Sequence, residues 1–125
     1  NIRINIRINI IMATDEYNFC KYVDIMNSST ILEPDFIQIL RKMYISILIK
    51  INSKIKEKIT ELGQQMLFLT SFVILSKYEN ERIVNITTLK NFSPATFEVT
   101  NLTSRILELE LMILKYINFD VEKFK

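Results

Sequence analysis

Lys77 and Glu110 are charged residues that stand within two apolar stretches of the sequence. Lys77 follows the nearly uninterrupted apolar run 66–75. Glu110 has apolar residues at its i−4, i−3, i+3 and i+4 positions, namely Ile106, Leu107, Ile113 and Leu114, so its neighbours on a helix are all apolar. A charge in apolar surroundings is costly unless it is paired. We therefore expect each group either to be paired within the fold or to bind a partner.

The residues that most enzymes use for chemistry are scarce in this chain. It contains no His and a single Cys, Cys20, so the commonest acid–base group is missing and no internal disulfide can form. Cys20 falls on an apolar helix face, and we expect a buried thiol because no His could activate it as a nucleophile. Gly63 is the only glycine, which excludes a phosphate-binding glycine loop. We predict no enzymatic activity, no cofactor and no metal.

Composition limits the class of protein further. The chain has 125 residues, nearly half of them apolar, with one Gly and two Pro, which favours a single helical domain. The net charge is +2 and the lysines are scattered, so we expect no nucleic-acid partner. No segment reaches the roughly 18–20 apolar residues of a membrane span. With a single Cys, we expect a reducing, intracellular location in the cytoplasm, the nucleus or both.

The first residues form a repeat of Asn-Ile-Arg-Ile. The alternation of β-branched and polar residues is typical of a strand. We interpret residues 1–11 as a low-complexity extension, with a short edge strand as the alternative, and residues 12–125 as the functional helical domain.

Apolar periodicity and capping residues predict five helices from Thr14 onward. The expected ranges are about 14–26, 34–51, 57–79, 86–92 and 93–118. The third is apolar on almost every side over 66–75, as expected of a helix that others surround. The predicted fold is all-α, with five helices around a buried third helix.

Two of these helices carry recognisable motifs. The third ends in Leu-Ser-Lys-Tyr-Glu (75–79), and the last contains Leu-Glu-Leu-Glu-Leu-Met-Ile-Leu-Lys-Tyr-Ile-Asn-Phe-Asp (107–120). These motifs resemble the cyclin box, in which the third helix typically ends Ala-Ser-Lys-Tyr-Glu-Glu and the fifth ends Leu-Asn-Phe-Asp. The resemblance covers about residues 14–121 and is most specific over 68–79 and 106–121. Leu-Glu-Leu-Glu is similar to the P-type cyclins of fungi and protists.

The resemblance implies a regulatory subunit that docks on the αC helix of a cyclin-dependent protein kinase. In cyclins the third and fifth helices form the docking face. By position, Lys77 and Glu110 would bond to kinase backbone groups and so help hold αC inward in the active arrangement. The apolar residues beside them would be Ile74, Tyr78, Leu114, Phe119 and Val121.

Structural roles stay open for several of these residues. Lys77 also suits a helix C-terminus, where the dipole favours a cation. Glu110 could pair with Lys77 or Arg105 inside the fold, and Tyr78 and Phe119 could belong to the core.

The sequence departs from the family pattern in the second helix and in length. Ser46 and Ile47 replace the Asp and Arg of the usual Tyr-Ile-Asp-Arg, so a polar network that orients the family's Lys is absent. The Met-Arg-Ala-Ile-Leu segment of the first helix and the second five-helix repeat are also missing. The alternative function is a non-kinase helical interaction protein. It would be an adaptor or virus-like decoy that holds an amphipathic helix in a groove between the second and third helices.

Overall fold

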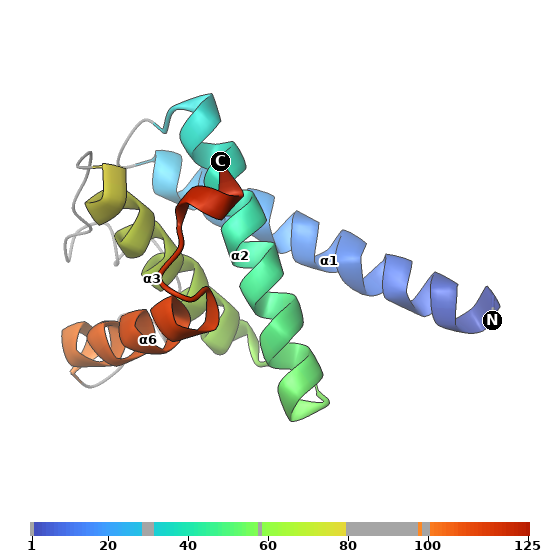
Figure 1. Ribbon diagram of the computed structural model, residues 1–125. Helices are drawn as coiled ribbons and strands as arrows, with labels where there is room; N and C mark the ends of the chain where they lie inside the picture. Colours follow the sequence, from blue (N-terminus) through green and yellow to red (C-terminus); the bar gives the residue numbers. More distant parts are fainter. Residues whose placement is uncertain (1, 29–31, 58, 80–97, 99–100) are drawn as a thin grey trace.

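The computed structural model describes residues 2–28, 32–57, 59–79, 98 and 101–125 (Figure 1). Over these ranges the chain forms the α-helices α1 (Ile2–Asn27), α2 (Pro34–Ile55), α3 (Glu61–Glu79) and α6 (Leu102–Tyr116), followed by the short 3-10 helix η1 (Glu122–Phe124). The described residues contain no strand, so the all-α prediction is confirmed. The expected helix 86–92 and the start of the expected helix 93–118 lie outside the described residues. The five-helix arrangement therefore stays a prediction.

The strand interpretation of the N-terminal repeat is wrong. Helix α1 begins at Ile2 and continues without a break to Asn27, through the expected boundary at residue 12. Figure 1 shows its N-terminal part projecting away from the other helices. A strand needs a neighbouring strand to satisfy its backbone, and the described chain offers none. Extending an existing helix costs no new nucleation, which favours the helix here.

Helix α3 is the centre of the fold. Among the described elements, it packs most closely against α6 and α2 and also contacts α1. Every residue from Gln64 to Phe72 is buried, and so are Ile74, Leu75 and Ser76. The buried Thr70 hydroxyl donates to the Met66 carbonyl at 2.7 Å, which satisfies it inside the helix. The expectation of a buried third helix is confirmed, because its apolar surface has no single solvent face.

Aromatic rings connect the first three helices. The ring centroids of Phe19 (α1), Tyr44 (α2) and Phe68 (α3) lie 5.7–5.9 Å from one another, and Tyr22 joins them at 5.5 Å from Phe68. All four side chains are fully or almost fully buried. Tilted and edge-to-face pairs at such distances add to the apolar burial. This cluster fixes which face of α1 is covered.

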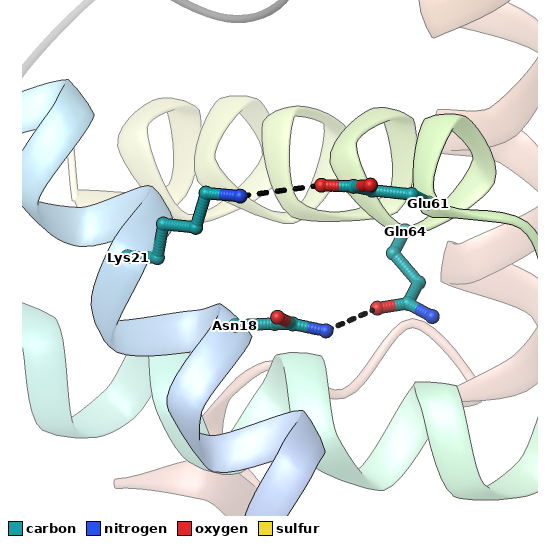
Figure 2. A network of polar contacts seen from close by, with 4 residues as sticks. All are labelled: Asn18, Lys21, Glu61 and Gln64. Atoms are coloured by element: carbon teal, nitrogen blue, oxygen red, sulfur yellow. Dashed lines mark hydrogen bonds and ion pairs between the residues drawn. The ribbon is translucent and has the colours of Figure 1, made fainter.

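Polar contacts set the position of α1 on its neighbours (Figure 2). Asn18 donates from Nδ2 to Gln64 Oε1 at 3.0 Å, and Lys21 Nζ lies 3.3 Å from Glu61 Oε1. On the other side, Arg41 of α2 forms a two-pronged ion pair with Glu16, with Nε to Oε2 at 2.8 Å. Helix α1 is thus tied to the first turns of α3 and to α2.

Cys20 corrects a sequence expectation. Its thiol is exposed, because α1 turns Phe19, Tyr22, Val23 and Met26 toward the core and leaves Cys20 on the outer side. The expected buried thiol is therefore wrong.

The helix boundaries also differ from those expected. Helix α2 continues to Ile55 and ends at Lys56, whose φ of 57° is left-handed. Helix α3 begins at Glu61, because the preceding residues make a turn in which Asn52 Oδ1 accepts the Ile59 N–H at 3.2 Å. This hydrogen bond joins residues seven positions apart and leaves no mark on the apolar periodicity. The sequence pattern therefore did not predict that α3 begins only at Glu61.

Removing the Tyr44 hydroxyl is expected to stabilise the fold. Tyr44 is fully buried, and its hydroxyl makes no hydrogen bond with the described residues. An unsatisfied buried hydroxyl costs about 1–3 kcal/mol, so Tyr44→Phe should raise the free energy of unfolding by about 1 kcal/mol. Urea denaturation measures it, with the exposed Tyr17→Phe as a control that changes little. A loss of stability in Tyr44→Phe would contradict this account.

Alkaline pH is expected to unfold the protein through its buried phenols. Burial raises the pKa of Tyr22 to about 12, with smaller contributions from Glu61 and Asp15, and burial also raises the pKa of Tyr44. Both groups titrate near pH 10 when unfolded. Below pH 10 the free energy of unfolding does not depend on these two groups. It falls above pH 10, for Tyr22 as the pH rises from 10 to about 12, because the unfolded chain loses its protons first. The stability of Tyr22→Phe should fall less steeply over this window, whereas Tyr17→Phe should follow wild type.

Candidate functional site

The packing of α3 on α6 brings Lys77 and Glu110 together. Lys77 Nζ lies 3.0 Å from each oxygen of the Glu110 carboxylate. Arg105 pairs with Glu108 instead, at 3.4 Å. The interpretation that Glu110 pairs with Lys77 inside the fold is confirmed. The two residues are 33 positions apart in sequence, so this contact connects the last turn of α3 with the middle of α6.

The two partners of this ion pair differ in exposure. The Lys77 side chain is 58% exposed and that of Glu110 only 14%. Lys77 lies in the last turn of α3, where the helix dipole also favours a cation. An ammonium has three donors, so Lys77 can bond to a further acceptor without leaving Glu110. The pair is therefore a fixed polar point on an accessible surface.

The other predicted site residues divide into two groups. Tyr78 is 41% exposed and Phe119 is 63% exposed, so the alternative that they belong to the core is wrong. Leu114 is partly buried and packs against the core. Ile74 and Val121 are buried and belong to the core itself. Of the five apolar residues, Tyr78, Phe119 and part of Leu114 are within reach of a partner.

Two leucines of α6 complete this surface, and the sequence did not single them out as site residues. Leu107 is 53% exposed and Leu111 is 51% exposed. They are spaced i, i+4 and continue to Leu114 at i+7, so the three share one face of α6 beside Glu110. The sequence did contain an indication of this surface, because α6 has apolar residues on more than one face. Ile106 and Ile113 fill the buried face, so the remaining apolar residues are left for the accessible one. We call Leu107, Leu111 and Leu114 the α6 stripe.

The chain turns back after α6 and lies against the end of α3. Asn118 and Phe119 both have left-handed backbone conformations, with φ of 55° and 57°. Val121 and Phe124 are buried, and η1 packs on α2. Tyr78 donates its hydroxyl to the Glu122 carboxylate, and Lys125 Nζ lies 2.9 Å from Glu79 Oε1. The last residues of the chain thus border the Lys77 surface.

A cleft of about 560 Å³ is bordered by Lys125 of the same C-terminal segment. Helix α2 and the residue before it supply most of its wall. The lining residues are Glu33, Asp35, Phe36, Gln38, Ile39, Lys42, Glu79 and Lys125. Of these residues, only Phe36 and Ile39 have apolar side chains.

Two other kinds of site find no support in the described part of the chain. There, no three His, Cys, Asp or Glu side chains gather into a group that could hold a metal ion. None of the described helices is both long and apolar enough to span a membrane.

Comparison with known proteins gives no relative for this chain: no family model, no curated protein and no solved structure matches it. What the site can do is therefore inferred from its own geometry.

The ion pair is expected to contribute modestly to stability. A double-mutant cycle with Lys77→Met and Glu110→Gln should give a coupling of about 0.5–1 kcal/mol, because one partner is largely exposed. The coupling should shrink in 1 M salt, which screens exposed charges. The longer and more exposed pair Lys21–Glu61 serves as the matched cycle and should couple less. Equal coupling in both cycles would mean that α6 does not hold Glu110 against Lys77.

Proposed function

We propose that this chain is a cyclin-like regulatory subunit that binds a cyclin-dependent protein kinase through α3 and α6. The observation that supports it best is the contact between Lys77 and Glu110 at 3.0 Å. These residues belong to the two motifs that resemble the cyclin box, and the fold brings them to one surface point. The exposed α6 stripe and Tyr78 lie in the same two helices.

The arrangement suits a partner helix together with the backbone next to it. The α6 stripe offers apolar area to be removed from water, at about 25 cal/mol per Å². Lys77 and Glu110 can donate to and accept from peptide groups of the partner, and charge-assisted bonds of this kind are worth about 1.5–3 kcal/mol. Apolar contact supplies affinity, and the central ion pair fixes where the partner helix must lie.

The mechanism we propose is a population shift in the kinase. A kinase whose αC helix moves between outward and inward positions is active only when its own Lys–Glu ion pair and metal site are assembled. A subunit that binds the inward form more tightly raises its population in proportion to that difference in affinity. The described residues would contribute a docking surface and no catalytic group.

Helix α2 departs from the cyclin pattern at Ser46 and Ile47, and for this reason we propose kinase binding, rather than full kinase activation, as the main activity. Ile47 is fully buried in the apolar core where the family pattern has Arg, and Ser46 is partly buried where it has Asp. Lys77 is therefore oriented by Glu110, without a second charged residue from this part of α2. A docking point with this support can hold a partner, and we infer weaker control over the kinase's active state.

The second candidate is a non-kinase adaptor or decoy that holds an amphipathic helix. The cleft beside α2 is the feature that favours it. A helix in a groove needs apolar anchors at i, i+3, i+4 and i+7 and a matching apolar floor. With Phe36 and Ile39 among six polar or charged lining residues, the cleft meets that need less well than the α6 stripe does.

Direct binding to purified kinases tests the proposal. Cyclin-dependent kinases from the source organism, expressed one by one, would be measured against the immobilised chain by interferometry. Lys77→Glu places two carboxylates in contact, and Glu110→Ala removes the acceptor; each should weaken binding at least tenfold, the equivalent of about 1.4 kcal/mol.

The matched controls are Lys21→Glu and Glu61→Ala, which disrupt the α1–α3 ion pair in the same way at the other end of α3. They should bind like wild type, and circular dichroism should find all four variants folded. Undiminished kinase binding by folded Lys77→Glu would exclude the proposed docking surface. Binding of an amphipathic helical peptide that a folded Ile39→Ala variant loses would favour the second candidate, because Ile39 lines the cleft and is only partly buried.

A further inference from the structure

The residues that follow α6 form a strap over the end of α3, which we define as Phe119–Lys125. Two buried side chains hold it down. Val121 and Phe124 have almost no exposed area, and η1 lies against α2 (Figure 1). Lys123 Nζ donates back to the Ile117 carbonyl at 3.0 Å, which closes the turn. The strap is thus a packed element with its own contacts.

The polar contacts of the strap converge on Tyr78. Its hydroxyl donates to the Glu122 carboxylate, and Lys125 Nζ lies 5.1 Å from the centre of its ring. Lys125 is held there by Glu79 Oε1 at 2.9 Å and by Glu122 Oε1 at 3.6 Å. The hydroxyl and one face of the Tyr78 ring are therefore already engaged by the chain itself.

The hinge of the strap is strained. Asn tolerates the left-handed region, but an aromatic residue rarely adopts it, and Phe119 has a φ of 57°. Its side chain is 63% exposed, so little burial offsets the strain. The ion pairs that close the strap are partly exposed, with 37% of the Lys125 side chain, 25% of that of Glu79 and 61% of that of Glu122 accessible, so we expect a modest contribution from them. The contacts of Lys125 and Glu122 with Tyr78 can therefore open while Val121 and Phe124 stay packed in the core.

We propose that the strap is an autoinhibitory element that competes with the partner for Tyr78. This inference rests on the proposed function, because it concerns the same docking surface. A partner helix that packs on the Tyr78 ring must displace the Lys125 ammonium from it. The apparent affinity is then reduced by the fraction of molecules in which the strap is open.

The test uses two substitutions that loosen the strap and keep its apolar anchors. Glu122→Gln weakens the bond to the Tyr78 hydroxyl, and Lys125→Met removes the ion pairs and keeps an unbranched chain. Each should tighten kinase binding about twofold to fivefold, the range expected from the loss of exposed ion pairs. Glu61→Gln and Lys21→Met remove equivalent charges from an exposed ion pair at the other end of α3 and should leave the affinity unchanged.

A second readout needs no kinase. The ring resonances of Tyr78 in ¹H–¹³C NMR should shift in both strap variants and stay in place in both controls. Unshifted resonances would overturn the strap, and shifted resonances with unchanged or weaker kinase binding would overturn autoinhibition and leave the proposed function intact. If neither wild type nor the strap variants bind any kinase tested, both proposals fail; if only the variants bind, autoinhibition is supported.

Discussion

The fold depends on one constraint: α3 is apolar on nearly all sides and has to be covered on all of them. Among the described residues, α2 and α6 make most of the contacts with α3, and α1 packs on it through the Phe19–Tyr44–Phe68 cluster. Of the residues of α3, only Glu61, Lys77 and Tyr78 are exposed. The helix therefore reaches solvent only at its ends. At its C-terminal end it meets α6 and the strap, and there the ion pairs of Lys77 and Lys125 lie beside the exposed Tyr78 ring.

The sequence predicted the parts of this arrangement that depend on local pattern. The uninterrupted apolar run identified α3 as central, and the isolated charges of Lys77 and Glu110 pointed to a pairing that the fold supplies. Features that depend on how helices face one another were not predictable. Cys20, which was expected to be buried, is exposed, and Ile74, which was expected on the docking face, is buried. Which face of a helix is covered depends on the helices that pack against it. The left-handed turn at Asn118 and Phe119 contains no glycine, so the sequence did not predict it. Residues 2–11 are helical although their alternation of apolar and polar residues is typical of a strand.

The proposed docking surface combines two properties that usually conflict. To bind the proposed partner it would have to be apolar, yet it would also have to be stable in water without that partner. Pairing Glu110 with Lys77 avoids a buried lone charge, and the strap engages the Tyr78 ring, so the free surface is partly satisfied. We expect a partner to be able to replace both contacts, the Lys77–Glu110 ion pair and the contact of Lys125 with the Tyr78 ring, with contacts of its own. The proposed binding and its proposed control thus arise from the same few contacts at the end of α3.

The most direct measurement is a hydrogen-exchange footprint of the chain with and without a bound cyclin-dependent kinase. The account predicts slower exchange in the last turns of α3 and along α6 on binding, with the strap residues exchanging faster as they are displaced. Exchange in the first turns of α3, where Lys21 meets Glu61, should not change. Protection confined to the start of α2, around Phe36 and Ile39, with α6 unaffected, would contradict it.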